Sequence, residues 1–182
     1  MKIRGALRGA VAFTVFCTAS VGMSRSAHAS FTITDSLEVS PTDWSLYFTL
    51  GPTLAYHYTN NPGLARTGSG VTLLTSSGSI SVSMWKTFMD PRNEEPPHPC
   101  YVSVYLRNVL SAPQPVRLSM FRVEDNTYIG LTTVNVTSSA YTYYELDALG
   151  DCEQFTTVGI EALGPGVSAA GVAVDDIALH LL

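Results

Sequence analysis

The sequence predicts an all-β domain, folded as a two-sheet antiparallel β-sandwich. No window of about a dozen residues shows helical periodicity, whereas apolar and polar residues alternate at period two in many short segments. Gly, Pro, Ser, Thr and Asn gather between these segments, as they do at turns. About ten short strands without helices are typical of a sandwich rather than of a parallel α/β fold.

Residues 1–29 predict a signal peptide that is cut before Ser30. A basic head is followed by an apolar run, and Ala27 and Ala29 place small side chains at the two positions that a signal peptidase reads. The apolar run is too short to cross a bilayer, which takes roughly 20 apolar residues. We therefore expect a secreted protein, periplasmic or extracellular, without membrane insertion.

The composition of residues 30–182 limits the partners of the mature protein. These 153 residues fit a single domain with its own core. They carry 6 basic and 15 acidic side chains, a net charge of −9 with histidine neutral. A phosphate backbone or an anionic membrane surface attracts clustered Lys and Arg. We therefore expect no nucleic-acid partner and no membrane partner.

Ten strands are expected in the domain, in the following order. They span residues 31–39, 44–54, 71–75, 79–84, 101–107, 116–123, 128–136, 141–146, 155–162 and 172–181. Alternation is cleanest in 79–84 and 101–107, where one face is apolar and the other is polar or aromatic. The acidic, proline-rich segment 90–99 is expected to be a loop between these two strands.

Two cysteines remain after the leader is removed, Cys100 and Cys152. An even count in an exported chain favours one disulfide between them, and the alternative is a pair of buried free thiols. Asn135 begins an Asn-Val-Thr sequon, which is a glycosylation site if the source is eukaryotic.

The last expected strand changes its apolar face at Asp175-Asp176. Val172 and Val174 share one parity, whereas Ile177 and Leu179 share the other. If Asp175 points inward, its carboxylate needs a cation or several hydrogen-bond donors, because an unpaired buried charge costs several kcal/mol. The alternative is a β-bulge that turns both carboxylates toward solvent.

Four segments of the chain resemble galactose-binding-like jelly rolls, the fold of many secreted carbohydrate-binding modules. They are the closing strand 173–179, the opening segment 36–39 followed by Trp44, the segment 67–73, and the aromatic-led segment 141–146. The resemblance spans nearly the whole mature chain, and it implies a jelly-roll fold that binds carbohydrate.

The same resemblance implies a structural calcium ion between the first and last strands. Carried over by position, Glu38 and Asp175 are its side-chain ligands and Asp176 is a weaker candidate. Calcium prefers oxygen ligands, so this donor set is chemically sensible.

No catalytic motif stands out in the sequence. The Gly-x-Ser-x-Gly elbow of serine hydrolases is absent, and the three histidines of the mature chain match no zinc motif. Acidic residues are numerous but mark no particular glycosidase pair. We therefore favour a non-catalytic protein, and a polysaccharide-acting enzyme stays open.

A candidate binding face follows if strands 79–84 and 101–107 pair as neighbours. Their outward side chains would then share one surface that mixes aromatic rings with hydrogen-bonding groups, as sugar binding requires. The candidates are Ser83, Trp85, Tyr101, Tyr105 and Arg107, with Tyr56 and Tyr58 adding a loop contact. The predicted ligand is a polysaccharide or other glycan.

Two other interpretations of this face stay open. The aromatic rings can serve packing alone, for example beneath the proline-rich loop. The same face can also meet a protein partner, in a structural or adhesion component of a cell envelope or extracellular matrix.

Overall fold

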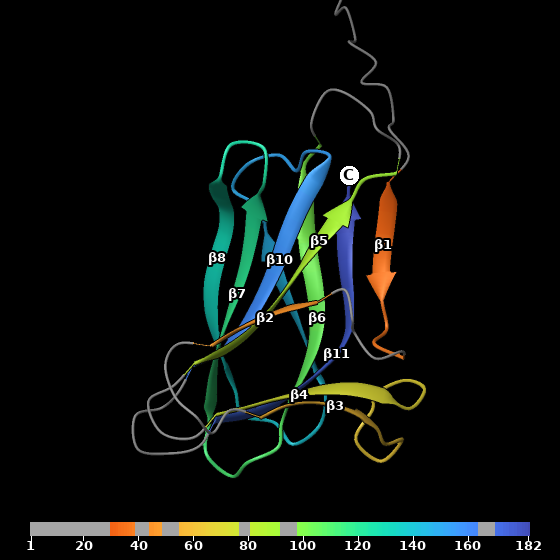
Figure 1. Cartoon of the computed structure of the whole chain (residues 1–182), viewed down its shortest axis with the longest axis vertical. Helices are drawn as coiled ribbons and strands as arrows, with labels where there is room; N and C mark the ends of the chain where they lie inside the picture. Colours follow the sequence, from red (N-terminus) through yellow and green to blue (C-terminus); the bar gives the residue numbers. More distant parts are fainter. Residues whose placement is uncertain (1–29, 39–43, 49–54, 77–80, 92–97, 164–169) are drawn as a thin grey trace, which may run out of the picture.

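The computed structural model describes residues 30–38, 44–48, 55–76, 81–91, 98–163 and 170–182. They form two antiparallel β-sheets that pack face to face, which confirms the predicted all-β sandwich (Figure 1). None of the described residues forms a helix long and apolar enough to cross a membrane. The expected signal peptide, residues 1–29, lies outside the described residues and stays a prediction.

Sheet A has six strands in the described residues and is built around its longest strand, β11. Its order is β3-β4-β11-β6-β9, and β1 also pairs with β11. The first part of β11 pairs with β4, whereas Ile177–Leu181 pair with β1. The strands are β1 Phe31–Asp35, β3 Ala55–Asn60, β4 Gly70–Ser76, β6 Cys100–Asn108, β9 Thr142–Asp147 and β11 Ala170–Leu181.

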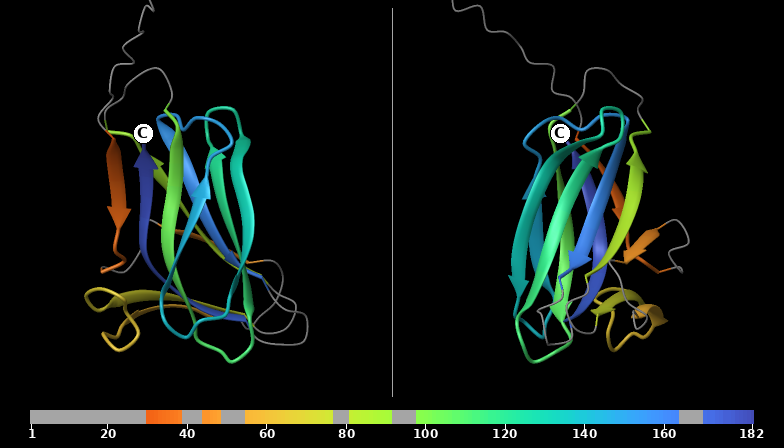
Figure 2. Two further views of the ribbon diagram at one scale, coloured as in Figure 1. Left: turned by 180° about the vertical axis from the view of Figure 1, so that it is seen from behind. Right: turned by 60° about the vertical axis from the view of Figure 1, so that its left-hand side comes forward.

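Sheet B has five strands in the order β2-β5-β10-β7-β8. They are β2 Ser45–Phe48, β5 Val82–Met89, β7 Gln114–Arg122, β8 Thr127–Val136 and β10 Phe155–Ala162. Strand β10 pairs with β5 on one side and β7 on the other, although it is distant from both in sequence. The two views of Figure 2 show the sheets as separate layers.

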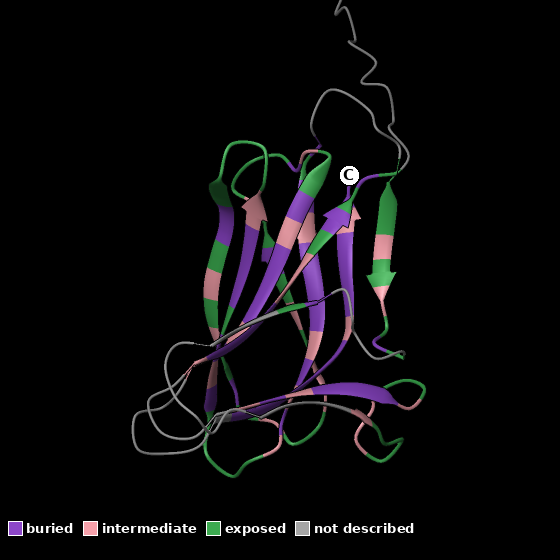
Figure 3. Cartoon of the chain, in the orientation of Figure 1, coloured by how far each residue is buried: buried purple, intermediate pink, exposed green. Residues whose placement is uncertain are grey.

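Side chains from the inner faces of both sheets form one hydrophobic core. Buried and more exposed positions follow each other along β7, β8 and β10, as the period of a strand requires (Figure 3). Sheet B contributes Met84, Leu118 and Ile160, whereas sheet A contributes Val104 and Leu106. Truncating one of these larger side chains to Ala costs about 2–5 kcal/mol.

A charged pair joins the two sheets beside this core. Asp35 at the end of β1 accepts hydrogen bonds from Lys86 Nζ at 2.8 Å and from Trp44 Nε1 at 2.9 Å. Its other oxygen accepts the Leu37 N–H at 2.9 Å. Burial by itself raises the pKa of Asp35, but the bonds from Lys86, Trp44 and Leu37 hold it below the usual value.

A β-bulge in β11 explains the change of apolar face in the sequence. The pairing with β6 shifts register between Asp175 and Ala178, and Asp176 has a positive φ of 46°. Val174 before the bulge and Ile177 after it are therefore both fully buried. The bulge is confirmed, but the expected turn of both carboxylates toward solvent is wrong for Asp175: its exposed fraction is 0%, and it accepts backbone hydrogen bonds as the inward alternative requires.

The predicted disulfide is confirmed. Cys100 at the start of β6 is bonded to Cys152, with the Cα atoms 5.8 Å apart. His98 and Cys152 also exchange backbone hydrogen bonds of 3.0 and 2.8 Å, so the bridge ties the strand β6 to the segment before β10.

One strand was not predicted, and one expected strand pairing is wrong. The sequence did not predict β3 at Ala55–Asn60; of the strand expected over 44–54 the structure describes β2 at Ser45–Phe48, and residues 49–54 lie outside the described residues. The sequence also placed the strands around 79–84 and 101–107 side by side. In the structure β5 pairs with β2 and β10, whereas β6 pairs with β11 and β9, so the two strands lie in opposite sheets.

Candidate functional site

The outer face of sheet B carries a row of side chains centred on Trp85. Cross-strand pairing places Trp85 between Ser45 of β2 and Gly159 of β10, and Gly159 in turn pairs with Ser119 of β7. A Cβ atom at Gly159 would lie 2.5 Å from the Trp85 ring atoms Cε3 and Cζ3, so the indole lies across β10 at close range. The indole N–H donates to Ser83 Oγ at 3.0 Å. Strand pairing and this bond therefore hold Trp85 in one orientation.

A second row on the same face combines hydroxyls with aromatic rings. Thr157 of β10 pairs with Thr87 of β5 and with Phe121 of β7. The hydroxyls of Thr87 and Thr157 lie 2.8 Å apart and share a hydrogen bond. The Phe121 ring meets Tyr128 of β8 edge to face at 5.2 Å, and Tyr128 is 57% exposed.

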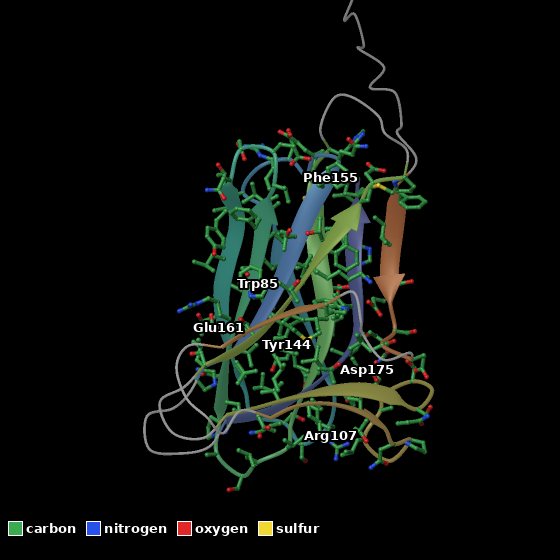
Figure 4. The ribbon with its side chains drawn as sticks, in the orientation of Figure 1. Trp85, Arg107, Tyr144, Phe155, Glu161 and Asp175 are labelled. Carbon is green, nitrogen blue, oxygen red and sulfur yellow. A yellow bond between two sulfur atoms is a disulfide. The ribbon has the colours of Figure 1, made fainter. Side chains whose placement is uncertain are left out.

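These two rows border an open groove of about 500 Å³, within the range of about 300–1,000 Å³ that is typical of small-molecule sites. Its lining residues are Ser45, Trp85, Thr87, Phe121, Val123, Tyr128 and Thr157. Figure 4 shows Trp85 and Glu161 over the strands of sheet B, well away from Asp175 and Arg107. The groove therefore offers aromatic rings and hydroxyls, the two kinds of group that contact a sugar ring.

The outer face of sheet A carries a second aromatic group. Tyr101 of β6 stacks on His180 of β11 with the ring centroids 4.2 Å apart, and His180 Nε2 lies 2.9 Å from Ser103 Oγ. Burial lowers the pKa of His180, although Glu145 opposes the shift. Tyr143 of β9 donates to Glu145 Oε2 at 2.6 Å, and this bond raises the pKa of Tyr143 to about 12.

The loop between β3 and β4 covers the other end of this face. The Arg66 guanidinium lies 3.5 Å above the Tyr105 ring and also pairs with Asp176. Arg107 Nη1 donates to the Gly63 carbonyl oxygen at 3.5 Å. Tyr105 and Arg107 are therefore engaged by this loop.

The same loop gathers the three carboxylates that the sequence nominated as calcium ligands. Asp175 Oδ2 accepts the Arg66 N–H at 2.7 Å, and Glu38 Oε2 accepts the Ser69 N–H at 2.9 Å. Burial raises the pKa of Asp175, its backbone donors lower it in part, and the Asp176 carboxylate raises it further. A cation beside these oxygens would relieve both the burial and the repulsion.

The oxygen chemistry of Glu38, Asp175 and Asp176 fits a hard cation. Gly68, whose φ is 56°, also fits this site, because any side chain there would overlap the Glu38 carboxylate. However, the described residues contain no group of three or more His, Cys, Asp or Glu side chains placed to hold a metal ion. A backbone carbonyl shell would have to complete the coordination, and calcium stays a prediction.

The structure divides the predicted binding face into two groups. Trp85 and Ser83 lie on sheet B, whereas Tyr101, Tyr105 and Arg107 lie on sheet A. The single shared face is therefore wrong, because β5 and β6 are not neighbours. Tyr56 and Tyr58 belong to β3 of sheet A, and their side chains lie outside the described residues.

Sequence reasoning missed most of the groove on sheet B. Phe121 and Tyr128 belong to strands that the alternation pattern had located, and the outward parity of Phe121 was readable from Leu118 and Met120. The missing information was the strand order, since β10 separates β5 from β7.

No protein-family model and no curated protein matches the chain. Solved structures match its fold. One is TmCBM61 in complex with beta-1,4-galactotriose, with a TM-score of 0.56 and 13% identity over 77% of this chain and 88% of that chain. Another is the CBM22-1 xylan-binding domain of Xyn10C from Paenibacillus barcinonensis, with a TM-score of 0.56 and 14% identity over 82% of this chain and 92% of that chain.

A third match is the enzymatically active domain of tailspike protein 4 from bacteriophage CBA120. Its TM-score is 0.57 at 12% identity, over 78% of this chain and 20% of that chain, so this chain spans about a fifth of its length. These likenesses confirm the predicted jelly-roll fold of carbohydrate-binding modules. At such low identity they concern the fold alone.

Proposed function

We propose that this protein binds a glycan in the groove on the outer face of sheet B, with Trp85 as its main contact. The observation that supports it most is the groove itself, in which the indole of Trp85, bonded to Ser83, lies beside the exposed Tyr128 ring, the partly buried Phe121 ring and hydroxyl groups. Sugars stack their C–H faces on such rings while their hydroxyls bond to polar side chains.

Two further features support this proposal. Of the solved modules that share the fold, one is in complex with beta-1,4-galactotriose and another is a xylan-binding domain. The Cys100–Cys152 disulfide fits an oxidising compartment, and therefore a protein exported to where polysaccharides occur. The surface that we propose differs from the single face expected from sequence, because it uses Trp85 without Tyr101 or Tyr105.

The test is affinity electrophoresis or pull-down on a panel of soluble and insoluble polysaccharides. We expect wild type to bind at least one of them and Trp85→Ala to lose that binding with its melting temperature kept. Tyr143→Ala is the matched control, because it removes a half-exposed ring from the opposite sheet. Equal binding by wild type and Trp85→Ala would contradict the proposal.

We also propose a structural calcium ion at the loop between β3 and β4. Glu38 and Asp175 would supply its carboxylate oxygens, and Asp176 is the weaker candidate because it already pairs with Arg66. The support is the burial of Asp175, which raises its pKa, and the close approach of the Glu38 carboxylate to Gly68, where an added Cβ atom would overlap Glu38 Oε1. The ion would fix this loop and would not touch the groove on sheet B.

A further inference from the structure

We infer that the groove on sheet B selects an uncharged polysaccharide, an inference that rests on the proposed function. The described residues that line the groove include no Asp, Glu, Lys, Arg or His. They present hydroxyls from Ser45, Thr87, Tyr128 and Thr157, and aromatic or aliphatic carbon from Trp85, Phe121 and Val123. Every polar side chain among these described lining residues is therefore neutral.

The charged side chains nearest to the groove are already paired. Arg117 and Glu161 lie opposite each other on the same face and form an ion pair of 2.8 Å. Lys86, next to Trp85 in the strand, donates instead to Asp35 at 2.8 Å. A sugar carboxylate would have to displace Glu161 to pair with Arg117.

Charged residues next to the lining residue Val123 in the sequence also have partners. Arg122 pairs with Asp125 and lies 3.4 Å from Glu153. Glu124 accepts the Phe155 N–H at 2.8 Å. An ammonium group of an amino sugar therefore meets no carboxylate among the described residues that line the groove.

The energetic consequence follows from desolvation. A charge that leaves water without gaining a partner loses several kcal/mol, whereas a sugar hydroxyl exchanges one hydrogen bond for another. The net charge of −9 in residues 30–182 adds a long-range repulsion against polyanions. Neutral chains escape both penalties, whereas a polycation is spared the repulsion but not the desolvation cost.

Isothermal titration calorimetry of the purified protein tests this selection. The probes are cellohexaose, xylohexaose and a galacto-oligosaccharide as neutral ligands, oligogalacturonate as the anionic ligand, and a chitosan oligomer as the cationic ligand. We expect a neutral probe to bind at least about tenfold more tightly than either charged probe, a difference of ~1.4 kcal/mol. Its Kd should change less than about twofold between ~0.02 and ~0.5 M NaCl, because no ion pair forms.

Glu161→Gln provides a second measurement on the same surface. It removes the partner of Arg117 without altering a lining residue, so we expect affinity for oligogalacturonate to rise at low salt and affinity for the neutral probe to stay unchanged. No gain for the anionic probe would contradict the role assigned to this ion pair.

The outcomes separate the inference from the function on which it rests. Tight binding of a charged probe that Trp85→Ala abolishes would overturn the inference and leave glycan binding in place. Absence of binding by every probe, neutral and charged, would overturn both. Binding that Trp85→Ala leaves unchanged would refute the proposed site.

Discussion

The substitution Gly159→Ala tests whether the close approach of Trp85 to β10 is needed for binding. The new methyl group would lie 2.5 Å from Cε3 and Cζ3 of the indole and 2.5 Å from Ser119 Oγ. Ordinary carbon contacts begin near ~3.5 Å, so the indole has to move by about 1 Å. We expect the ring to lift away from the sheet and into the groove.

The magnitude follows from two opposing effects. Overpacking in a closed site costs about 1–3 kcal/mol, whereas replacing Gly by Ala restricts the unfolded chain and returns about 0.4–1 kcal/mol. Trp85 is only half-buried and can move outward, which places the cost at the low end. The expected net loss of unfolding free energy is about 1 kcal/mol, with a loss of glycan affinity of about tenfold or more.

Urea denaturation gives the stability, and titration with the best neutral saccharide gives the affinity. Near-UV circular dichroism reports the changed surroundings of the indole. Gly150→Ala is the control, since the nearest atom to its added Cβ is Ile129 Cγ2 at 3.9 Å. Wild-type affinity in Gly159→Ala, with an unchanged near-UV spectrum, would refute the positioning of Trp85 by this glycine.

Three further predictions concern stability. Replacing Cys100 and Cys152 with Ser should lower the unfolding free energy by about 4 kcal/mol, because the bridge closes a segment with a sequence separation of 52. Urea denaturation measures this loss, and a value below ~1 kcal/mol would contradict the prediction. The pKa of Asp35 is lower in the folded protein than its usual value of 3.8. Its contribution to the free energy of unfolding is therefore fully present above pH 3.8 and is lost as the pH falls through the lower pKa of the folded state. Thermal unfolding followed from neutral pH into acid should therefore show a weaker acid dependence in Asp35→Asn than in wild type, and parallel curves would contradict the assigned role. After chelator treatment, added calcium should raise the melting temperature of wild type and should raise that of Glu38→Gln less. An unchanged melting temperature of wild type would contradict the proposed calcium site.

The sequence was sufficient for the fold class because that depends on local patterns. Alternation placed Val82 and Met84 on one side of a strand and Ser83 and Trp85 on the other, as the structure has them. The disulfide followed from the cysteine count and the expected export. The bulge at Asp175 followed from the change of parity within one strand.

The composition of the site could not be predicted in the same way, because strand order is a property of the whole chain. Trp85 and Phe121 are brought to one groove by β10, which comes after both in the sequence. Residues 92–97 of the expected loop 90–99 lie outside the described residues, and the strands before and after them, β5 and β6, belong to different sheets. From sequence, a loop of this kind can equally close a hairpin. Nothing in the local alternation distinguishes these two connections.

The burial of Asp175 also required the tertiary structure. A bulge by itself would leave its carboxylate in water, and the loop that covers it comes from residues 61–69, more than 100 positions earlier in the chain. Hydrogen bonds from the Arg66 and Thr67 backbone then satisfy this carboxylate.

The most direct measurement of the central claim is NMR of the two tryptophan indole N–H signals during titration with a neutral oligosaccharide. The mature chain contains Trp85 and Trp44, and Trp44 is 6% exposed with its N–H bonded to Asp35. We predict that the Trp85 signal shifts with ligand concentration while the Trp44 signal stays in place. Saturable binding that leaves the Trp85 signal unshifted and instead shifts the NMR signals of Tyr101 and Tyr143 on sheet A would contradict the account.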